Sequence, residues 1–260
     1  MNMTTFDFED GNGPVPAHKH PKGGGWVADT ATVDETAYVG AEARVYGNAD
    51  VYDNAKVFDN ARVYDNVKVF GNAKVFGNAQ VFGDAMVYYN ARVYGNAWVY
   101  DNAEVFGNVE VSGNARVSGS AQVFHDALVF GSTQVSGNAR AYDTARVSGN
   151  ARVSGNTRVF DNAWVYDNAL VYGSAWVYGS ARVSDNALVY DTALISGNAR
   201  VSGNAQVSDH AWVSGNAQVS DHAWVYGNAR VSDTAEVGDD VKEDMFIERN
   251  GKRYKLVEVE

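Results

Sequence analysis

An aliphatic residue recurs at every sixth position from Val27 to Val237, giving 36 consecutive six-residue repeats with no insertion. Only Ala141 and Ile195 replace valine in this column. A small residue stands two positions earlier, which is Gly25 in the first repeat and otherwise alanine, with these exceptions: Val67, Val109, Thr133 and Thr157. Because side chains two positions apart point to the same side of a strand, the small and aliphatic columns share one face. The repeat therefore predicts short strands that each bury one small and one aliphatic side chain.

From Val45 to Val231, the residue of the aliphatic column is followed by an aromatic residue or serine, and then by a turn signal. Glycine or aspartate stands next in 32 of the 36 repeats, and asparagine follows in 21. These residues tolerate positive φ angles or bond to their own backbone. An identical turn after every strand excludes a hairpin meander and requires a chain that coils in one sense. Three repeats per coil predict a triangular β-helix with 18 residues per coil and about 12 coils, a rod of about 58 Å at the usual strand spacing.

The pattern of a small residue, any residue, an aliphatic residue and a polar turn, as in NARVYG and DNAWVY, resembles the hexapeptide repeat of left-handed parallel β-helix proteins. This superfamily includes bacterial acyltransferases and γ-class carbonic anhydrases, and its members are usually trimers. Acyltransferase repeats mostly place glycine directly after the aliphatic residue, so this chain is more similar to the VxGNAxV arrays of uncharacterised bacterial and bacteriophage proteins. The resemblance implies a left-handed β-helix over about four fifths of the chain. The spacing of the repeat does not determine the handedness of the helix, and a right-handed triangular solenoid, as in bactofilins, is the alternative.

The repeat divides the chain into three parts. We expect an extended N-terminal arm or cap over residues 1–26, the all-β parallel β-helix over residues 27–241 and a C-terminal β-hairpin over residues 242–260. All three prolines lie in the first part. In the last part, Met245 to Glu248 and Arg253 to Val259 are predicted strands joined by Asn250-Gly251, a frequent two-residue turn. Without a terminal part to cover it, each end of the β-helix would expose unpaired strand edges.

Composition limits the partners. The net charge is −11 and no block of basic residues is present, which disfavours nucleic-acid binding. The chain contains no cysteine, which excludes disulfides and thiolate ligands. The first residues are acidic and lack an apolar run, so we expect no secretory signal, no membrane association and synthesis in the cytoplasm, with or without later assembly into a phage virion.

Only side chains outside the two inner columns can carry a function. Outward positions that are 18 residues apart fall on the same face of the predicted helix, which gives three faces. Serine interrupts the run of aromatic residues on two of these faces, at Ser112 and Ser118. The third face carries eight successive rings, here called the aromatic ladder: Tyr52, Phe70, Tyr88, Phe106, Phe124, Tyr142, Phe160 and Tyr178. Stacked rings stabilise neighbouring strands, but this stripe also exceeds the apolar surface that a monomer normally exposes. The ladder is therefore either strand packing or a contact face, at a trimer axis or toward another protein.

Besides Trp26, five tryptophans stand directly before a valine and are predicted to point outward: Trp98, Trp164, Trp176, Trp212 and Trp224. Exposed tryptophan is enriched at binding hot spots. Cross-strand packing against Tyr178 or Tyr226 is the alternative. We place the five tryptophans with the aromatic ladder as candidate interface residues.

The histidines are weak candidates for chemistry. His125, His210 and His222 occupy turn positions on three different corners, so they cannot converge on one zinc ion within a subunit. One of them could act as a general base at a subunit boundary. His18 and His20 are two residues apart and could bind a metal with Asp7 or Asp10.

The sequence thus favours a non-catalytic structural or interaction protein, used in assembly or attachment, such as a phage appendage or decoration element. We expect a homo-oligomer, a trimer by resemblance, with virion proteins, surface proteins or glycans as further partners and no cofactor. The alternatives are a coenzyme A-dependent acyltransferase of the hexapeptide type and a glycan-binding rod.

Overall fold

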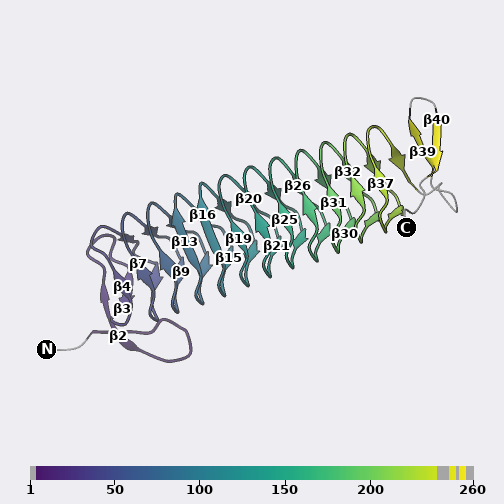
Figure 1. The fold of residues 1–260 in the computed structure, drawn as a ribbon. Helices are drawn as coiled ribbons and strands as arrows, with labels where there is room; N and C mark the ends of the chain where they lie inside the picture. Colours follow the sequence, from purple (N-terminus) through teal and green to yellow (C-terminus); the bar gives the residue numbers. More distant parts are fainter. Residues whose placement is uncertain (1–3, 239–245, 250–251, 256–260) are drawn as a thin grey trace. The chain divides into compact units, whose positions relative to one another are not determined.

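The computed structural model describes residues 4–238, 246–249 and 252–255 (Figure 1). The chain divides into two compact units, Met1–Phe130 (unit 1) and Gly131–Glu260 (unit 2). Each unit is a parallel β-solenoid of six turns, about 12 turns in total, and its strands belong to three sheets. The described residues contain no helix at all, and hence none able to cross a membrane. The expected all-β parallel β-helix is confirmed, while its left-handedness stays a prediction.

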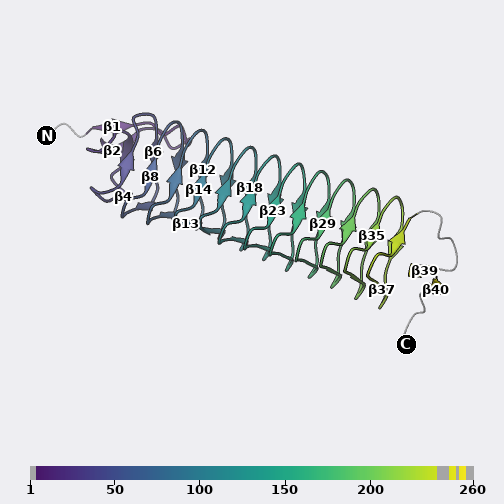
Figure 2. The same ribbon diagram turned by 90° about the horizontal axis from the view of Figure 1, so that it is seen from above.

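In unit 1, each turn of the chain passes once through all three sheets (Figure 2). Sheet 1 contains, in spatial order, β3 (Trp26–Ala28), β6 (Arg44–Val45), β9 (Arg62–Val63), β12 (Gln80–Val81), β15 (Trp98–Val99) and β18 (Arg116–Val117). Sheet 2 contains β4 (Thr32–Val33), β7 (Asp50–Val51), β10 (Lys68–Val69), β13 (Met86–Tyr89), β16 (Glu104–Gly107) and β19 (Gln122–Val123). Sheet 3 contains β5 (Tyr38–Val39), β8 (Lys56–Val57), β11 (Lys74–Val75), β14 (Arg92–Val93), β17 (Glu110–Val111) and β20 (Leu128–Val129).

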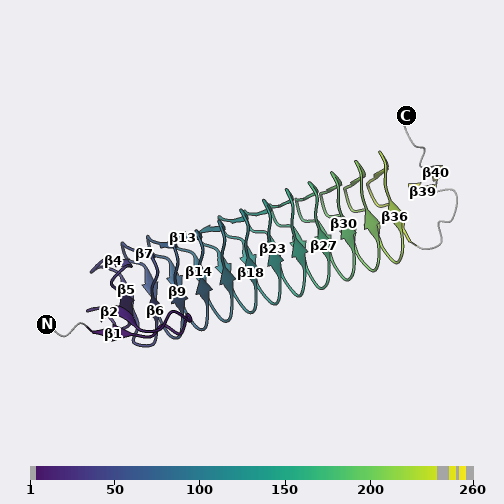
Figure 3. The ribbon, with the colours of Figure 1, turned by 90° about the horizontal axis from the view of Figure 1, so that it is seen from below.

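Unit 2 repeats the same arrangement (Figure 3). Its sheet 1 strands are β21 (Gln134–Val135), β24 (Arg152–Val153), β27 (Leu170–Val171), β30 (Leu188–Val189), β33 (Gln206–Val207) and β36 (Trp224–Val225). Its sheet 2 strands are β22 (Arg140–Ala141), β25 (Arg158–Val159), β28 (Trp176–Val177), β31 (Leu194–Ile195), β34 (Trp212–Val213) and β37 (Arg230–Val231). Its sheet 3 strands are β23 (Arg146–Val147), β26 (Trp164–Val165), β29 (Arg182–Val183), β32 (Arg200–Val201), β35 (Gln218–Val219) and β38 (Glu236–Val237).

The two inner columns form the core of each unit. Val45 pairs in register with Val63, 18 residues later, and Val63 pairs with Val81. Valine and alanine side chains of these columns are almost all inaccessible to solvent. Their burial removes apolar surface from water in every turn, so that each turn is stabilised by its neighbours. The 18-residue register and the inward pair predicted from the repeat are confirmed.

The turn residue two positions after the valine has a left-handed conformation in every repeat from Gly47 to Asp233, with φ between 54° and 91°. Glycine adopts this region without strain, and aspartate is among the residues that tolerate it. Aspartate also satisfies a backbone donor, because Asp101 Oδ2 accepts the N–H of Gly119 in the next turn at 3.0 Å. The following asparagines form side-chain ladders, as in the 3.1 Å bond from Asn78 Nδ2 to Asn96 Oδ1. The predicted turn chemistry is confirmed.

An antiparallel strand pair covers the N-terminal end of unit 1. β1 (Thr5–Phe6) pairs with β2 (Val15–Lys19), and β2 pairs antiparallel with β3. The carbonyls of the first turn have no preceding turn to bond, so residues between β2 and β3 supply donors. His20 is 3% exposed and its Nε2 donates to the carbonyl of Asp34 at 3.1 Å, while Lys22 Nζ donates to the carbonyl of Thr36 at 2.7 Å. The expected arm or cap is therefore built of strands.

A β-hairpin follows the solenoid in the sequence of unit 2. β39 (Phe246–Arg249) pairs antiparallel with β40 (Lys252–Lys255). The predicted strands began one residue earlier in the first case and one residue later in the second. Met245, Asn250, Gly251 and residues 256–260 lie outside the described residues, as does Val241, where the repeat was expected to end. The last described solenoid strand is β38.

Candidate functional site

The aromatic ladder is a continuous ring stack within each unit. In unit 1, the centroids of Tyr52, Phe70 and Tyr88 follow one another at 4.8 Å with nearly parallel planes. The stack continues from Tyr88 through Phe106 to Phe124 at 4.8 and 5.0 Å. Each such pair contributes about 0.5–1.5 kcal/mol beyond the area that it buries.

In unit 2, Tyr142, Phe160 and Tyr178 stack at 5.0 Å. All eight ladder rings are half-buried, because neighbouring rings cover their faces and leave the edges in solvent. Burial raises the pKa of Tyr88 to about 12, with the Glu104 carboxylate as a second cause. The ladder residues therefore stabilise neighbouring strands and present a row of ring edges on sheet 2.

A ring stack on sheet 1 extends beyond the repeat, which sequence reasoning missed. Phe8, between β1 and β2, lies against Tyr46 with centroids 4.9 Å apart, and Tyr46 stacks on Tyr64 at 4.8 Å. Phe8 is 1% exposed. No periodic signal marks Phe8, because it lies outside the repeat. A lone apolar residue between acidic ones, in FDFED, is the available hint.

Four of the five tryptophans contact a residue of the preceding turn. Trp164 Nε1 donates to Ser148 Oγ at 2.9 Å, and Trp212 Nε1 donates to Ser196 Oγ at 3.0 Å. In both pairs the serine precedes the tryptophan by 16 residues, a diagonal neighbour in the sheet. Where that neighbour is aromatic, the rings meet edge to face: Trp98 on Phe82 and Trp176 on Phe160.

The exposed fraction separates the tryptophans further. Trp224 is 55% exposed and Trp176 36%, whereas Trp98, Trp164 and Trp212 are half-buried. Trp224 and Trp164 also contact the tyrosine two residues later, with centroids 5.0 and 4.5 Å apart. The contact of Trp224 with Tyr226 lies within one repeat and is not cross-strand packing, and Trp224 remains the most exposed of the five.

Three successive strands of sheet 2 in unit 2 have uncharged outward side chains. Trp176 pairs with Leu194, and Leu194 pairs with Trp212, in three successive strands. Together with Tyr178, these residues are named the tryptophan face. Arginines lie at both limits of this face: the Arg158 guanidinium is 4.6 Å from the Trp176 ring and that of Arg230 is 5.4 Å from the Trp212 ring. Tryptophan and arginine are the residue types enriched at protein interfaces.

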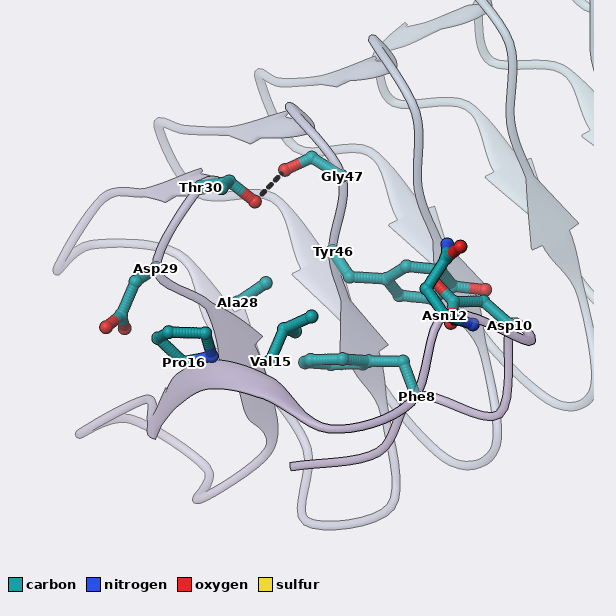
Figure 4. Close-up of a pocket in the computed structure, with 10 residues that line it drawn as sticks. All are labelled: Phe8, Asp10, Asn12, Val15, Pro16, Ala28, Asp29, Thr30, Tyr46 and Gly47. Carbon is teal, nitrogen blue, oxygen red and sulfur yellow. Dashed lines mark hydrogen bonds between the residues drawn. The ribbon is translucent and has the colours of Figure 1, made fainter. Parts of the chain in front are cut away.

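A pocket of about 310 Å³ lies between the N-terminal strand pair and the first turns (Figure 4). Phe8, Val15 and Ala28 line its apolar side. Asp10, Asn12 and Asp29 are among its polar lining residues. The volume lies at the low end of the range for small-molecule sites.

The polar groups of this pocket are already engaged. Asn12 donates to Asp10 through its backbone N–H at 3.0 Å and its side chain at 3.1 Å, and these bonds lower the pKa of the Asp10 carboxyl. Asp29 accepts a 2.9 Å bond from His18 Nδ1. Tyr46 is buried, which raises the pKa of its hydroxyl to about 12 and keeps it protonated. The pocket is thus a small, acidic site without an assembled nucleophile and base.

The histidines occupy separate environments. His125 lies at a turn with φ 61°, His210 contacts Thr192 Oγ1, and His222 Nε2 accepts a 3.1 Å bond from Asn204. His18 pairs with Asp29, whereas both ring nitrogens of His20 bond to backbone groups. Across residues 4–238, no three His, Asp or Glu side chains come together as a metal site would require. These histidines remain predictions as catalytic or metal-binding residues.

Seven segments of the chain match the family described as YdcK Beta solenoid repeat: residues 79–95, 111–125, 145–161, 163–179, 193–209, 205–221 and 217–233. A comparison with curated proteins gives no significant match. Most matched segments span 17 residues, close to one 18-residue turn, and begin at the alanine column. Together they cover less than half of the chain. The repeats are thus similar to a known β-solenoid repeat, in agreement with the parallel solenoid of the structure.

Proposed function

We propose that this protein is a non-catalytic structural scaffold that associates with further copies of itself through the outer face of sheet 2. The inner columns are nearly invariant along the repeat and serve the fold alone. The outward positions vary from turn to turn, so recognition belongs there. A solenoid presents such positions on long, regular faces, which suits assembly better than catalysis.

The tryptophan face is the observation that carries this proposal. Trp176, Leu194 and Trp212 are outward, uncharged and in consecutive strands. Trp176 remains 36% exposed, although Arg158 lies over its ring. Contiguous apolar surface bordered by polar residues marks protein contact sites. A second copy would bury these rings and could extend the contact along the aromatic ladder.

The mass in solution tests the proposal. We expect the wild-type protein to be an oligomer in light scattering, and Trp176→Ser/Trp212→Ser to lower the mass toward that of one chain. Trp224→Ser/Tyr226→Ser is the matched control, because Trp224 and Tyr226 are 55% and 49% exposed but lie on sheet 1. Tyr88→Ser/Phe106→Ser separates the two interpretations of the ladder: a lower mass indicates a contact face, whereas an unchanged mass with lower thermal stability indicates strand packing.

Two outcomes contradict the proposal: a monomeric wild-type protein, or an oligomer whose mass the tryptophan substitutions leave unchanged. Circular dichroism establishes that each variant keeps its strands. The expectation of a trimer, and of a place in a phage particle, is supported by the resemblance of the repeat alone. The measured mass distinguishes a trimer from the commoner dimer.

A further inference from the structure

A second pocket of unit 1, of about 410 Å³, is lined by three lysines and three uncharged polar residues. These residues are Lys22, Thr36, Asn54, Lys56, Asn72 and Lys74. The pocket lies on the corner between sheets 2 and 3, where the first turns meet the segment that follows β2. Three ammonium groups around one pocket are unusual in a chain with a net charge of −11. The composition of this lining suits an anion.

Two of the lysines are direct neighbours in the sheet. Lys74 on β11 pairs in register with Lys56 on β8, so their side chains leave the sheet one strand spacing apart, about 4.8 Å. Like charges directly opposite each other destabilise a sheet. Within the described residues, neither lysine forms an ion pair with a carboxylate. The pair therefore carries uncompensated positive charge.

Cation pairs elsewhere in unit 1 show how such charge is compensated. Arg44 and Arg62 are in register on sheet 1, and the Glu9 carboxylate bridges them at 2.8 and 2.9 Å. Next to Lys74 on sheet 3, Arg92 is bound by Glu110 at 2.8 Å. The lysine pair occupies the equivalent arrangement without a carboxylate from this chain. An external anion could take the place that Glu9 fills on sheet 1.

Other polar groups of the pocket offer further hydrogen-bond donors for an anion. One N–H of the Lys22 ammonium is held by the carbonyl of Thr36, at 2.7 Å, which leaves two donors of this group for a ligand. Asn72 Nδ2 donates to Asn90, so its amide is fixed beside the lysines. Asp53 precedes Asn54 in the same turn, but its Oδ2 accepts the backbone N–H of Gly71 at 3.1 Å.

We infer that Lys22, Lys56 and Lys74 form a binding site for a phosphate group, free or as a phosphate monoester. A doubly charged tetrahedral anion offers several oxygens, so it can accept charge-assisted hydrogen bonds from all three ammonium groups. Asn54 and Asn72 supply amide donors at the rim. This site is independent of the tryptophan face, which lies in the other unit.

Calorimetric titration with inorganic phosphate and with glycerol phosphate, at fixed ionic strength, tests the inference. We expect saturable binding of one anion per chain. Lys56→Gln/Lys74→Gln should weaken it by about tenfold for each charge-assisted hydrogen bond that is lost. Lys56→Arg/Lys74→Arg should keep most of the affinity. Tighter binding of the monoester identifies a phosphorylated organic ligand, and equal binding identifies free phosphate.

Arg182→Gln/Arg200→Gln is the matched control, because these arginines are an in-register pair on sheet 3 of unit 2 and their removal changes the net charge equally. The control should bind phosphate as the wild type does. The inference is wrong if neither probe gives saturable binding, or if the control loses as much affinity as the lysine variant. Circular dichroism spectra that match the wild type show that a loss of binding is not a loss of fold.

Discussion

Two threonines stand in the inner column where alanine is otherwise usual. Thr133 and Thr157 are completely buried, and their hydroxyl groups have no hydrogen-bond partner. A buried hydroxyl without a partner costs about 1–3 kcal/mol relative to water. The same column accepts valine at Val67 and Val109, both inaccessible to solvent. The interior therefore has room for a branched side chain but no partner for a polar one.

Thr157→Val should stabilise the protein. Valine keeps the shape of threonine and removes the orphaned hydroxyl, so we expect the free energy of unfolding to rise by about 1 kcal/mol. Chemical denaturation followed by circular dichroism measures the change. Thr144→Val is the control of opposite sign, because Thr144 Oγ1 donates to the carbonyl of Asp161 at 2.8 Å and this bond would be lost. A lower midpoint for Thr157→Val would show that the hydroxyl is satisfied after all.

The repeat predicts the burial and backbone conformation of a residue well where the surroundings of that residue are the same in every turn. The inner columns and the left-handed turn position follow from side-chain period and φ tolerance, and the structure confirms both. The contact that a tryptophan side chain makes depends instead on the residue 16 positions earlier. Trp164 finds a serine hydroxyl there and Trp176 finds a ring. Such contacts can be predicted only once the 18-residue register is known.

Among the elements, the N-terminal strand pair is the one that the repeat could not specify. Its contacts occur once: Phe8 adds a ring to the stack on sheet 1, and His20 and Lys22 bond carbonyls of the first turn. A periodic pattern carries no information about such single contacts. What the sequence does predict is the need for a cover, because the first turn of any solenoid leaves strand edges unpaired. The same limit applies to the lysine pocket, since Lys22 lies outside the repeat.

Docking of this strand pair should depend on pH through Glu9. The hydrogen bond and charge of Arg44, with a smaller effect of Arg62, hold the pKa of the Glu9 carboxyl below its ordinary value of 4.5. A lowered pKa in the folded state means that the stabilisation is complete above pH 4.5 and is lost as the pH falls through the lowered value. We expect amide protection of residues 15–19, relative to intrinsic exchange rates, to be constant from pH 7 to about pH 5 and to decrease in stronger acid.

Glu9→Gln should show the reduced protection already at pH 7 and little further change in acid. Glu42→Gln removes an equal charge from an exposed position in unit 1 and should behave like the wild type. Hydrogen exchange monitored by mass spectrometry resolves this segment. Equal profiles for wild type and Glu9→Gln would mean that the strand pair is held without Glu9, by contacts such as the stacking of Phe6 on Trp26 and of Phe8 on Tyr46.

At the scale of the whole molecule, the fold and the proposed function depend on different columns of one repeat. The alternation of alanine and valine with a polar turn determines the solenoid, its parallel sheets and the 18-residue register, and each of these was predictable. The proposed self-association depends on outward residues, whose number is large and whose partners would lie outside the chain. The sequence could therefore identify candidate faces, such as Trp176 and Trp212 on one sheet, but not what binds to them.

Deletions within unit 1 distinguish the effect of the inner columns on the fold from the effect of the outward residues on association. Removing residues 73–90, one full turn, places Phe106 directly after Phe70 on sheet 2 and keeps the aromatic ladder on one face. Removing residues 73–78 moves every later strand of unit 1 to the next sheet, so Phe106 and Phe124 leave the face of Phe70. Each repeat presents the same inward pair, so we expect both variants to keep wild-type circular dichroism per residue. Light scattering should show the wild-type number of subunits for the 18-residue deletion and fewer for the six-residue deletion. Equal assembly of the two variants would mean that the tryptophan face of unit 2, which neither deletion changes, carries the association without the unit 1 part of the aromatic ladder.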